Sequence, residues 1–169
     1  AVCFAAPKVE IVTSEGNIVV NLNEKAAPTT VANFVKYAKE GFYNGTIFHR
    51  VINNFMIQGG GYDTNMTQHE TDTITGEFLQ NGSFNMIPHE RGVISMARTA
   101  MSMDSASSQF FIMHRDSPSL NGQYAAFGKV TSGMEYVDKI AETETHSLTD
   151  MGMDDVPVQT QIIKTIIIK

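Results

Sequence analysis

The sequence predicts a mostly β protein: a closed or nearly closed β-barrel of about eight strands, with two helices covering its ends. Three observations predict this fold. Short β-branched or aromatic runs bounded by turn residues recur along the chain, and one early and one late segment have helical spacing instead. The length of 169 residues, 42% of them apolar, suits one domain with a core of its own.

The chain opens with a predicted hairpin and helix. Residues 8–13 (KVEIVT) and 17–23 (NIVVNLN) alternate apolar and polar side chains, and Gly16 between them can take the positive φ of a tight turn. After Pro28 the period changes to that of a helix, which ends before Gly41. The apolar face of this helix carries Val31, Phe34, Val35 and Ala38.

The rest of the chain alternates between loops and short strands. Residues 62–91 are polar and weakly periodic, which predicts loops with at most one short strand. Three strand-length apolar runs follow, at 92–98, 108–114 and 125–130. A second helix is predicted at 133–142, with Met134, Val137, Ile140 and Ala141 on one side. The β-branched run TQIIKTIIIK closes the chain as a buried strand.

Composition excludes several partners. The net charge is −6 without any basic cluster, so a nucleic-acid partner is not expected, and the apolar runs are too short to span a membrane. We expect a monomer. Residues 1–7 (AVCFAAP) form an extension before the domain at 8–169. They match the end of a secretory signal, which predicts a periplasmic or secreted protein, or they form a short edge segment of a cytoplasmic one.

Patterns for metal, cofactor or covalent chemistry are missing from the sequence. HETDT at 69–73 and HERGV at 89–93 lack the second His four residues on that a zinc helix needs. No GxSxG elbow is present, QGGGY lacks the spacing of a dinucleotide loop, and GKVTSG lacks the Ser or Thr of a P-loop. The sequence therefore predicts no metal and no cofactor.

Residues 47–61 (IFHRVINNFMIQGGG) place Arg50 among apolar neighbours and ahead of three glycines. Such a set suits a reaction without a covalent intermediate, rotation about an X–Pro bond, whose barrier of about 18–20 kcal/mol comes from amide resonance. Twisting the amide gives the prolyl nitrogen a lone pair. A guanidinium in an apolar site stabilises that twisted state more than the planar one.

The chain resembles the cyclophilins, the peptidyl-prolyl isomerases inhibited by cyclosporin. FHRVINNFMIQGGG, SMAR (95–98), SSQFFI (107–112) and FGKV (127–130) are similar to motifs of that family, in the same order and spacing. The resemblance extends over residues 8–169 and is nearest to bacterial members. It implies an eight-stranded antiparallel closed barrel capped by two α-helices, with the site on the outside of the barrel. It also implies a rotamase that acts on proline-containing peptides and on unfolded or folding proteins.

The resemblance also implies roles for individual residues. Arg50 would be the catalytic guanidinium. Gln58 and Gln109 would bind the substrate backbone, helped by main-chain groups of Ala97 and Arg98. The proline pocket would be lined by Phe55, Met56, Phe111, Leu120 and Tyr124.

Three positions depart from the commonest family pattern. Arg98 replaces an Asn, and Tyr124 replaces a His, both as in bacterial cyclophilins. Ser119 stands where cyclosporin-sensitive members have a Trp, and the chain contains no Trp. We therefore expect weak cyclosporin binding with isomerisation retained.

Other interpretations remain open from the sequence. The same fold could bind proline segments as a chaperone module with little turnover, although retention of Arg50 favours the enzyme. A lipocalin-like carrier is a second alternative, which the bulky residues predicted inside the barrel disfavour. Taken singly, Phe55, Met56 and Phe111 could be core residues, Arg50 a surface ion-pair partner, and Gln58 a strand-edge amide.

Overall fold

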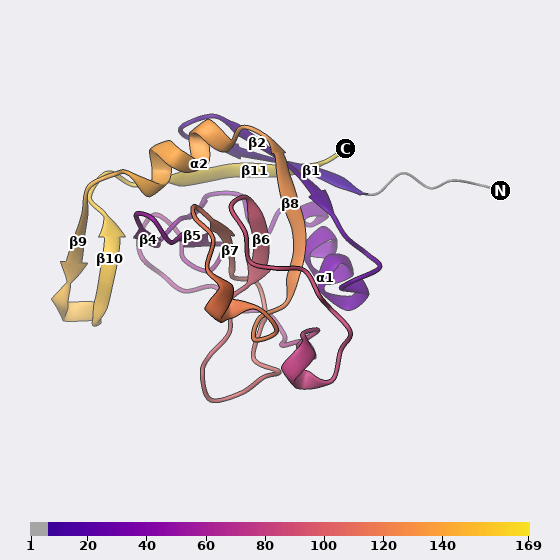
Figure 1. Ribbon diagram of the computed structural model, residues 1–169. Coiled ribbons are helices and arrows are strands. Elements are labelled where there is room, and N and C mark those ends of the chain that lie inside the picture. Colours follow the sequence, from indigo (N-terminus) through magenta and orange to yellow (C-terminus); the bar gives the residue numbers. More distant parts are fainter. Residues whose placement is uncertain (1–6) are drawn as a thin grey trace.

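The computed structural model describes residues 7–169 and shows a curled β-sheet with two helices (Figure 1). The helices are α1 (Pro28–Lys39) and α2 (Met134–Ala141). The strands are β1 (Lys8–Thr13), β2 (Asn17–Leu22), β3 (Thr46–Ile47), β4 (Arg50–Ile52), β5 (Met56–Gly59), β6 (Val93–Met96), β7 (Phe110–Met113), β8 (Ala126–Ser132), β9 (Thr145–Leu148), β10 (Met153–Pro157) and β11 (Ile162–Ile168). Three single 3₁₀ turns are η1 (Leu79–Asn81), η2 (Pro118–Leu120) and η3 (Thr149–Met151).

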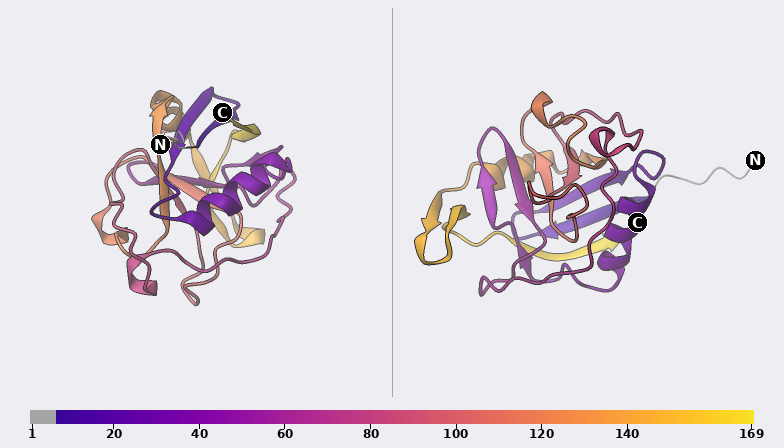
Figure 2. Two further views of the ribbon diagram at one scale, coloured as in Figure 1. Left: turned by 90° about the vertical axis from the view of Figure 1, so that its right-hand side faces the viewer. Right: turned by 90° about the horizontal axis from the view of Figure 1, so that it is seen from below.

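Nine strands form one antiparallel sheet in the order β3-β11-β1-β2-β8-β6-β7-β5-β4. Its two edge strands, β3 and β4, follow one another in the chain with only Phe48 and His49 between them, but they do not pair, so the sheet is curled without closing its ladder. Helices α1 and α2 lie at opposite ends of this barrel (Figures 1 and 2). The predicted mostly β fold, an antiparallel sheet with two covering helices, is confirmed; the sheet has nine strands where eight were expected, and it forms a half-barrel where a closed barrel was expected.

The inside of the barrel is filled with side chains. Phe34 of α1 lies 5.3–5.4 Å, centroid to centroid, from the rings of Tyr43, Phe110 and Phe127. All four aromatic residues are fully buried, together with the inward residues of β1 and β2. An interior packed in this way leaves no room for a carried ligand, which removes the lipocalin-like interpretation.

Most elements predicted by periodicity occur at their predicted places. The first hairpin, both helices and the strands within 92–98, 108–114, 125–130 and 160–169 are confirmed, and Gly16 has a φ of 153°. Residues 62–91 contain loops, η1 and isolated bridges, in agreement with the prediction. The hairpin β9–β10 was not predicted. That hairpin forms a separate two-stranded sheet beside the barrel (Figure 1).

The long loop 62–91 is tied to α1 through Glu77. The residue before the helix, Ala27, has no side chain that could cap it, so the first amides of α1 need other acceptors. The Glu77 carboxylate accepts from the amides of Thr29 (3.2 Å) and Thr30 (2.6 Å) and from the Thr30 hydroxyl (2.7 Å). A negative charge at a helix N-terminus is also favoured by the helix dipole.

The extension predicted at 1–7 is described only at Pro7, whose carbonyl accepts from the Leu22 amide at 2.8 Å. The proposed signal remnant falls on residues 1–6, which lie outside the described residues. Within residues 7–169, no helix has both the length and the apolar character required to cross a bilayer.

Candidate active site

The strands β5, β6 and β7 are buried on both faces, and the outer face carries the candidate site. Ile57 and Ile112 point into the barrel core, whereas Met56, Phe111 and Met113 belong to a second apolar cluster outside it. Alternation along a strand makes this separation unavoidable, because successive side chains point to opposite faces.

Strand register brings the predicted catalytic and binding residues into one row. Arg50 pairs with Gln58, Gln58 with Phe111, and Phe111 with Ser95. Directly paired residues of neighbouring strands point to the same face. Four side chains from β4, β5, β7 and β6 therefore lie side by side on the outside of the barrel.

Polar side chains on this row form a relay. The exposed guanidinium of Arg50 donates from Nη1 to Gln58 Oε1 at 3.3 Å. Gln58 Nε2 in turn donates to Gln109 Oε1 at 2.9 Å. Each amide is oriented by its neighbour, so the positive charge of Arg50 is held beside two amide side chains.

The apolar residues predicted for the proline pocket form one cluster next to that relay. Met56 and Phe111 expose only 2% and 4% of their surface and make its floor. The partly exposed members are Phe55, Ala97, Leu120 and Tyr124. The ring of Tyr124 meets Phe111 edge-on at 5.7 Å. An apolar patch with a buried floor that includes an aromatic ring, beside a guanidinium, is suited to a proline ring.

Arg98 is held against the rim of the same cluster. Its guanidinium carbon lies 4.8 Å from the ring centroid of Tyr124 and 5.1 Å from that of Phe78. Its Nε donates to the carbonyl of Gln123 at 3.0 Å. Arg98 thereby fixes Tyr124 by a cation–π contact as well as through the neighbouring backbone.

One of the two main-chain groups of Ala97 is already used within the protein. The amide of Ala97 donates to the carbonyl of Gln109 at 3.0 Å, so this N–H is used inside the protein and cannot bind substrate. Ala97 itself still lies at the site, between the apolar cluster and the cavity described next.

A cavity of about 360 Å³ continues the site beyond the relay. Four predicted residues line it, namely Gln58, Ala97, Arg98 and Gln109. Its other walls come from residues 68–73 and from the loop at 99–108. The polar segment 62–91, predicted as loops, therefore contributes one wall of this cavity. A larger hollow of about 910 Å³ lies elsewhere, between β2, β8 and residues 87–93, and shares none of the predicted site residues.

Sequence reasoning missed the support behind the apolar floor. His89 is buried and stacks on Phe111 with centroids 6.0 Å apart. Its Nε2 lies 2.9 Å from the Ser95 hydroxyl oxygen. Burial lowers the pKa of His89 to about 4, so the ring is neutral at neutral pH. The only sequence signal was the His itself, which was weighed as a metal ligand.

The three glycines after Gln58 allow close packing. A Cβ on Gly59 would come within 2.7 Å of the Ile47 carbonyl oxygen, and one on Gly61 within 2.5 Å of Gln109 Cγ. Gly60 has a φ of 89°, which favours glycine. Gly61 thus keeps open the space that the Gln109 side chain needs to reach Gln58.

Taken together, all ten predicted site residues lie on or beside one outer face of the barrel. The set combines a fixed positive charge, two oriented amides, an apolar patch and a neighbouring cavity. No side chain among them is a covalent nucleophile. Such a site can bind an extended peptide and stabilise charge that develops on an amide nitrogen.

Comparison with known proteins gives a consistent result. The family profile described as "Cyclophilin type peptidyl-prolyl cis-trans isomerase/CLD" matches residues 8–167. "Peptidyl-prolyl cis-trans isomerase A" of Dickeya dadantii (strain 3937) is 49% identical over 143 residues, which cover 82% of this chain and 73% of that protein. "Peptidyl-prolyl cis-trans isomerase B" of Escherichia coli (strain K12) is 43% identical over 163 residues, covering 91% and 94%.

Solved structures share the fold over nearly the whole chain. The crystal structure of a Cryptosporidium parvum cyclophilin type peptidyl-prolyl cis-trans isomerase has a TM-score of 0.81 and 28% identity, and covers 98% of each chain. The structure of that protein in the presence of the dipeptide Ala-Pro has a TM-score of 0.79, covering 96% of this chain and 98% of the other.

Proposed function

Because this chain belongs to the cyclophilin-type peptidyl-prolyl cis-trans isomerases, and catalyses that reaction, we propose that Arg50 is its catalytic group and the outer cluster its proline pocket. The observation that carries the proposal is the hydrogen-bonded relay Arg50–Gln58–Gln109, which lies beside the apolar cluster of Phe55, Met56 and Phe111. It sets a permanent cation next to an apolar patch that can receive a proline ring.

The proposed mechanism follows from the differential binding of two amide geometries. In the planar X–Pro bond the nitrogen lone pair is delocalised and accepts no hydrogen bond. Halfway through the rotation the lone pair becomes localised, and a guanidinium N–H can donate to it. Arg50 thus stabilises the transition state more than either ground state, which raises kcat.

The remaining residues bind the substrate on either side of the rotating bond. Phe55, Met56, Phe111, Leu120 and Tyr124 hold the proline ring, while Gln58 and Gln109 bind the backbone. We propose that residues preceding the proline enter the cavity of about 360 Å³ lined by Gln58 and Arg98. A relative solved with Ala-Pro present supports proline-containing peptides as ligands. We also propose that folding proteins are substrates and that the enzyme is a monomer. Cyclosporin is proposed to bind it weakly.

The test is a protease-coupled isomerisation assay on wild type, Arg50→Ala and Arg50→Lys. We expect kcat/KM to fall about 10²–10³-fold in Arg50→Ala, the range for loss of one transition-state donor. Arg50→Lys should recover only part of this, because an ammonium lacks the planar fork. Peptide affinity should change little, since the apolar pocket is intact.

Lys129→Ala provides the matched control, because Lys129 is an exposed cation on β8 outside the site. It should keep the wild-type rate. Equal rates for wild type and Arg50→Ala would show that Arg50 does not carry the reaction.

A further inference from the structure

The turn between β4 and β5 carries Phe55 and is held from behind by His114. Ile52 pairs with Met56, so residues 53–55 make the whole connection. Within the turn, the Phe55 amide donates to the Ile52 carbonyl at 3.0 Å. Asn54 has a φ of 65°, a conformation that Asn tolerates better than most residues.

His114 makes two hydrogen bonds to this turn, one from its ring and one from its backbone. Its Nδ1 accepts from the Asn54 backbone amide at 2.9 Å. Its own amide donates to the Phe55 carbonyl at 2.9 Å. Both bonds come from the end of β7, whose preceding residues form the floor of the proline pocket. His114 therefore couples the pocket's floor to its rim.

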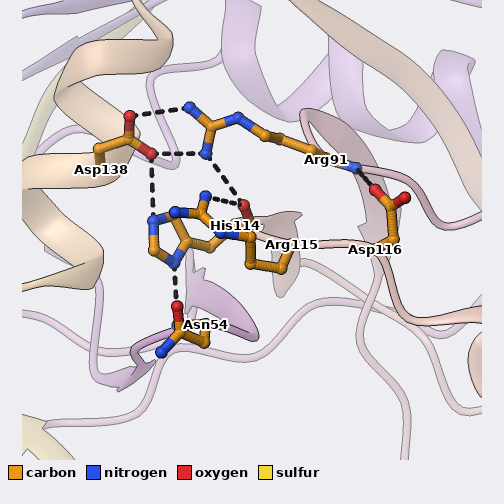
Figure 3. A network of polar contacts seen from close by, with 6 residues as sticks. All are labelled: Asn54, Arg91, His114, Arg115, Asp116 and Asp138. Atoms are coloured by element: carbon orange, nitrogen blue, oxygen red, sulfur yellow. Dashed lines mark hydrogen bonds and ion pairs between the residues drawn. The ribbon is translucent and has the colours of Figure 1, made fainter.

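The ring is oriented from its other side by α2 (Figure 3). Because Nδ1 accepts, the proton of the neutral ring lies on Nε2, which is 3.1 Å from Asp138 Oδ1. The N–H does not point along the line to this oxygen, so the contact is an ion–dipole interaction and not a linear hydrogen bond. Arg91 fixes the carboxylate with two bonds, of 2.7 and 2.8 Å, and donates to the His114 carbonyl at 3.0 Å.

The surroundings keep His114 neutral. Its side chain is fully buried, and burial is the main cause that lowers its pKa. The charges of Arg115 and Arg91 lower the pKa further, while Asp138 of α2 and Glu142 just after it raise the pKa and only partly offset this. A neutral ring keeps Nδ1 available as an acceptor. Protonation would set an N–H against the Asn54 N–H.

We propose that His114 is a positioning residue for the isomerase reaction, which fixes the 53–55 turn and thereby places Phe55 and the hairpin that carries Arg50. This inference rests on the proposed roles of Arg50 and Phe55. His114 touches no substrate and acts through the turn. A displaced turn would move the rim of the pocket relative to Phe111, which does not move with it.

Two replacements of His114 distinguish the role of Nδ1 from that of Nε2. The Oδ1 of His114→Asn lies near the place of Nδ1 and can accept from Asn54, but its side chain does not reach Asp138. His114→Gln places its amide near Nε2, toward Asp138, and offers no acceptor at the Nδ1 position. We expect His114→Asn to keep kcat/KM within about 2-fold and His114→Gln to lose about 5–10-fold, the factor for one buried hydrogen bond.

The amide resonance of Asn54 in a ¹⁵N–¹H spectrum gives an independent readout. It should stay near its wild-type position in His114→Asn and shift in His114→Gln. Ile18→Val, a core change on β2 away from the hairpin, controls for general loss of stability and should leave both readouts unchanged. Wild-type activity in both His114 variants overturns the inference, as do equal losses in the two or a reversed order.

If the His114 variants do not fold, a pH titration of the wild-type protein tests the inference. Acidification should lower kcat/KM in step with the His114 imidazole titration followed by NMR, and the Asn54 amide should shift over the same range. A constant kcat/KM while His114 titrates overturns the inference. Failure of the proposed function is seen separately, as a wild-type rate in Arg50→Ala.

Discussion

Nη1 of Arg50 donates to Oε1 of Gln58 across the β4–β5 pair, at 3.3 Å, and these two residues are also direct partners in the strand register. The guanidinium is thus held at a fixed distance from the Gln109 amide that follows in the relay. The sequence placed both residues in one motif but could not show that they touch. The register provides that information.

Gln58→Leu should reduce catalysis by disconnecting this relay. Arg50 would lose its acceptor and Gln109 its donor, while an apolar side chain of similar volume keeps the packing on β5. We expect kcat/KM to fall about 5–20-fold, equivalent to about 1–2 kcal/mol of transition-state stabilisation. Steady-state kinetics on an X–Pro peptide measures the change. Unchanged kcat/KM would show that Arg50 needs no partner.

Ser119→Trp should create tighter cyclosporin binding. Ser119 is exposed in η2, next to Leu120 of the apolar cluster, and an indole there would add apolar area and an N–H donor. The inhibition constant should fall about 10–100-fold, the range for about 1.4–3 kcal/mol. Peptide turnover should change less than about 2-fold, since Ser119 touches no part of the relay. Ser117→Trp, two residues earlier, should not tighten binding, and equal tightening by both would contradict the assignment.

Glu77→Gln should destabilise the fold without changing the site. Its carboxylate accepts three hydrogen bonds at the start of α1, and an amide would present a donor to amides that need acceptors. We expect the free energy of unfolding to fall by about 2 kcal/mol, or Tm by about 4–8 °C. Thermal unfolding followed by circular dichroism measures it. The exposed Glu24→Gln serves as the control and should leave Tm within about 1 °C, because exposed substitutions have small effects.

Acid should destabilise the protein through its buried histidines, which include His49 and His89 as well as His114. Burial lowers the pKa of His49 and of His89 to about 4 in the folded state, whereas a histidine of the unfolded chain titrates near 6.5. Between these values the unfolded chain binds more protons, so stability is complete above about pH 6.5 and declines as the pH falls toward 4. Each of these two histidines contributes about 2–3 kcal/mol to this loss.

Urea unfolding at about pH 7 and about pH 4.5 tests the sign. In His49→Gln the difference between the two pH values should shrink by about 2 kcal/mol, because the titrating group is gone. His146→Gln, an exposed histidine on β9, should retain the wild-type difference. A wild-type difference in His49→Gln would contradict the assignment.

The sequence predicted those elements that present one face to the core. Strands β1 and β2 alternate buried and less buried residues, and α1 buries Val31, Phe34 and Ala38 of its predicted face. The hairpin β9–β10 escaped because it is a small separate sheet with few buried residues and no clear alternation.

Site residues were predicted where motif and chemistry agreed, and missed where only tertiary packing defines them. Arg50 and Gln58 stand in one short segment whose resemblance to a family is specific. His89 and His114 lie behind the site, and their partners Ser95, Phe111 and Asp138 are brought to them by the fold. No spacing in the chain connects His114 with Asp138, 24 positions later on another element.

Strand β7 carries Phe111 on its outer face and Phe110 and Ile112 on its inner face, so a single layer of backbone separates the barrel core from the proposed proline pocket. Phe110 and Ile112 pack among core side chains, so β7 has no free space on its inner side. Enlarging or shrinking an interior neighbour will therefore be transmitted outward and change which peptides are accepted. Substrate preference in this protein can therefore evolve through changes in the volume of core side chains, as well as through changes at the surface.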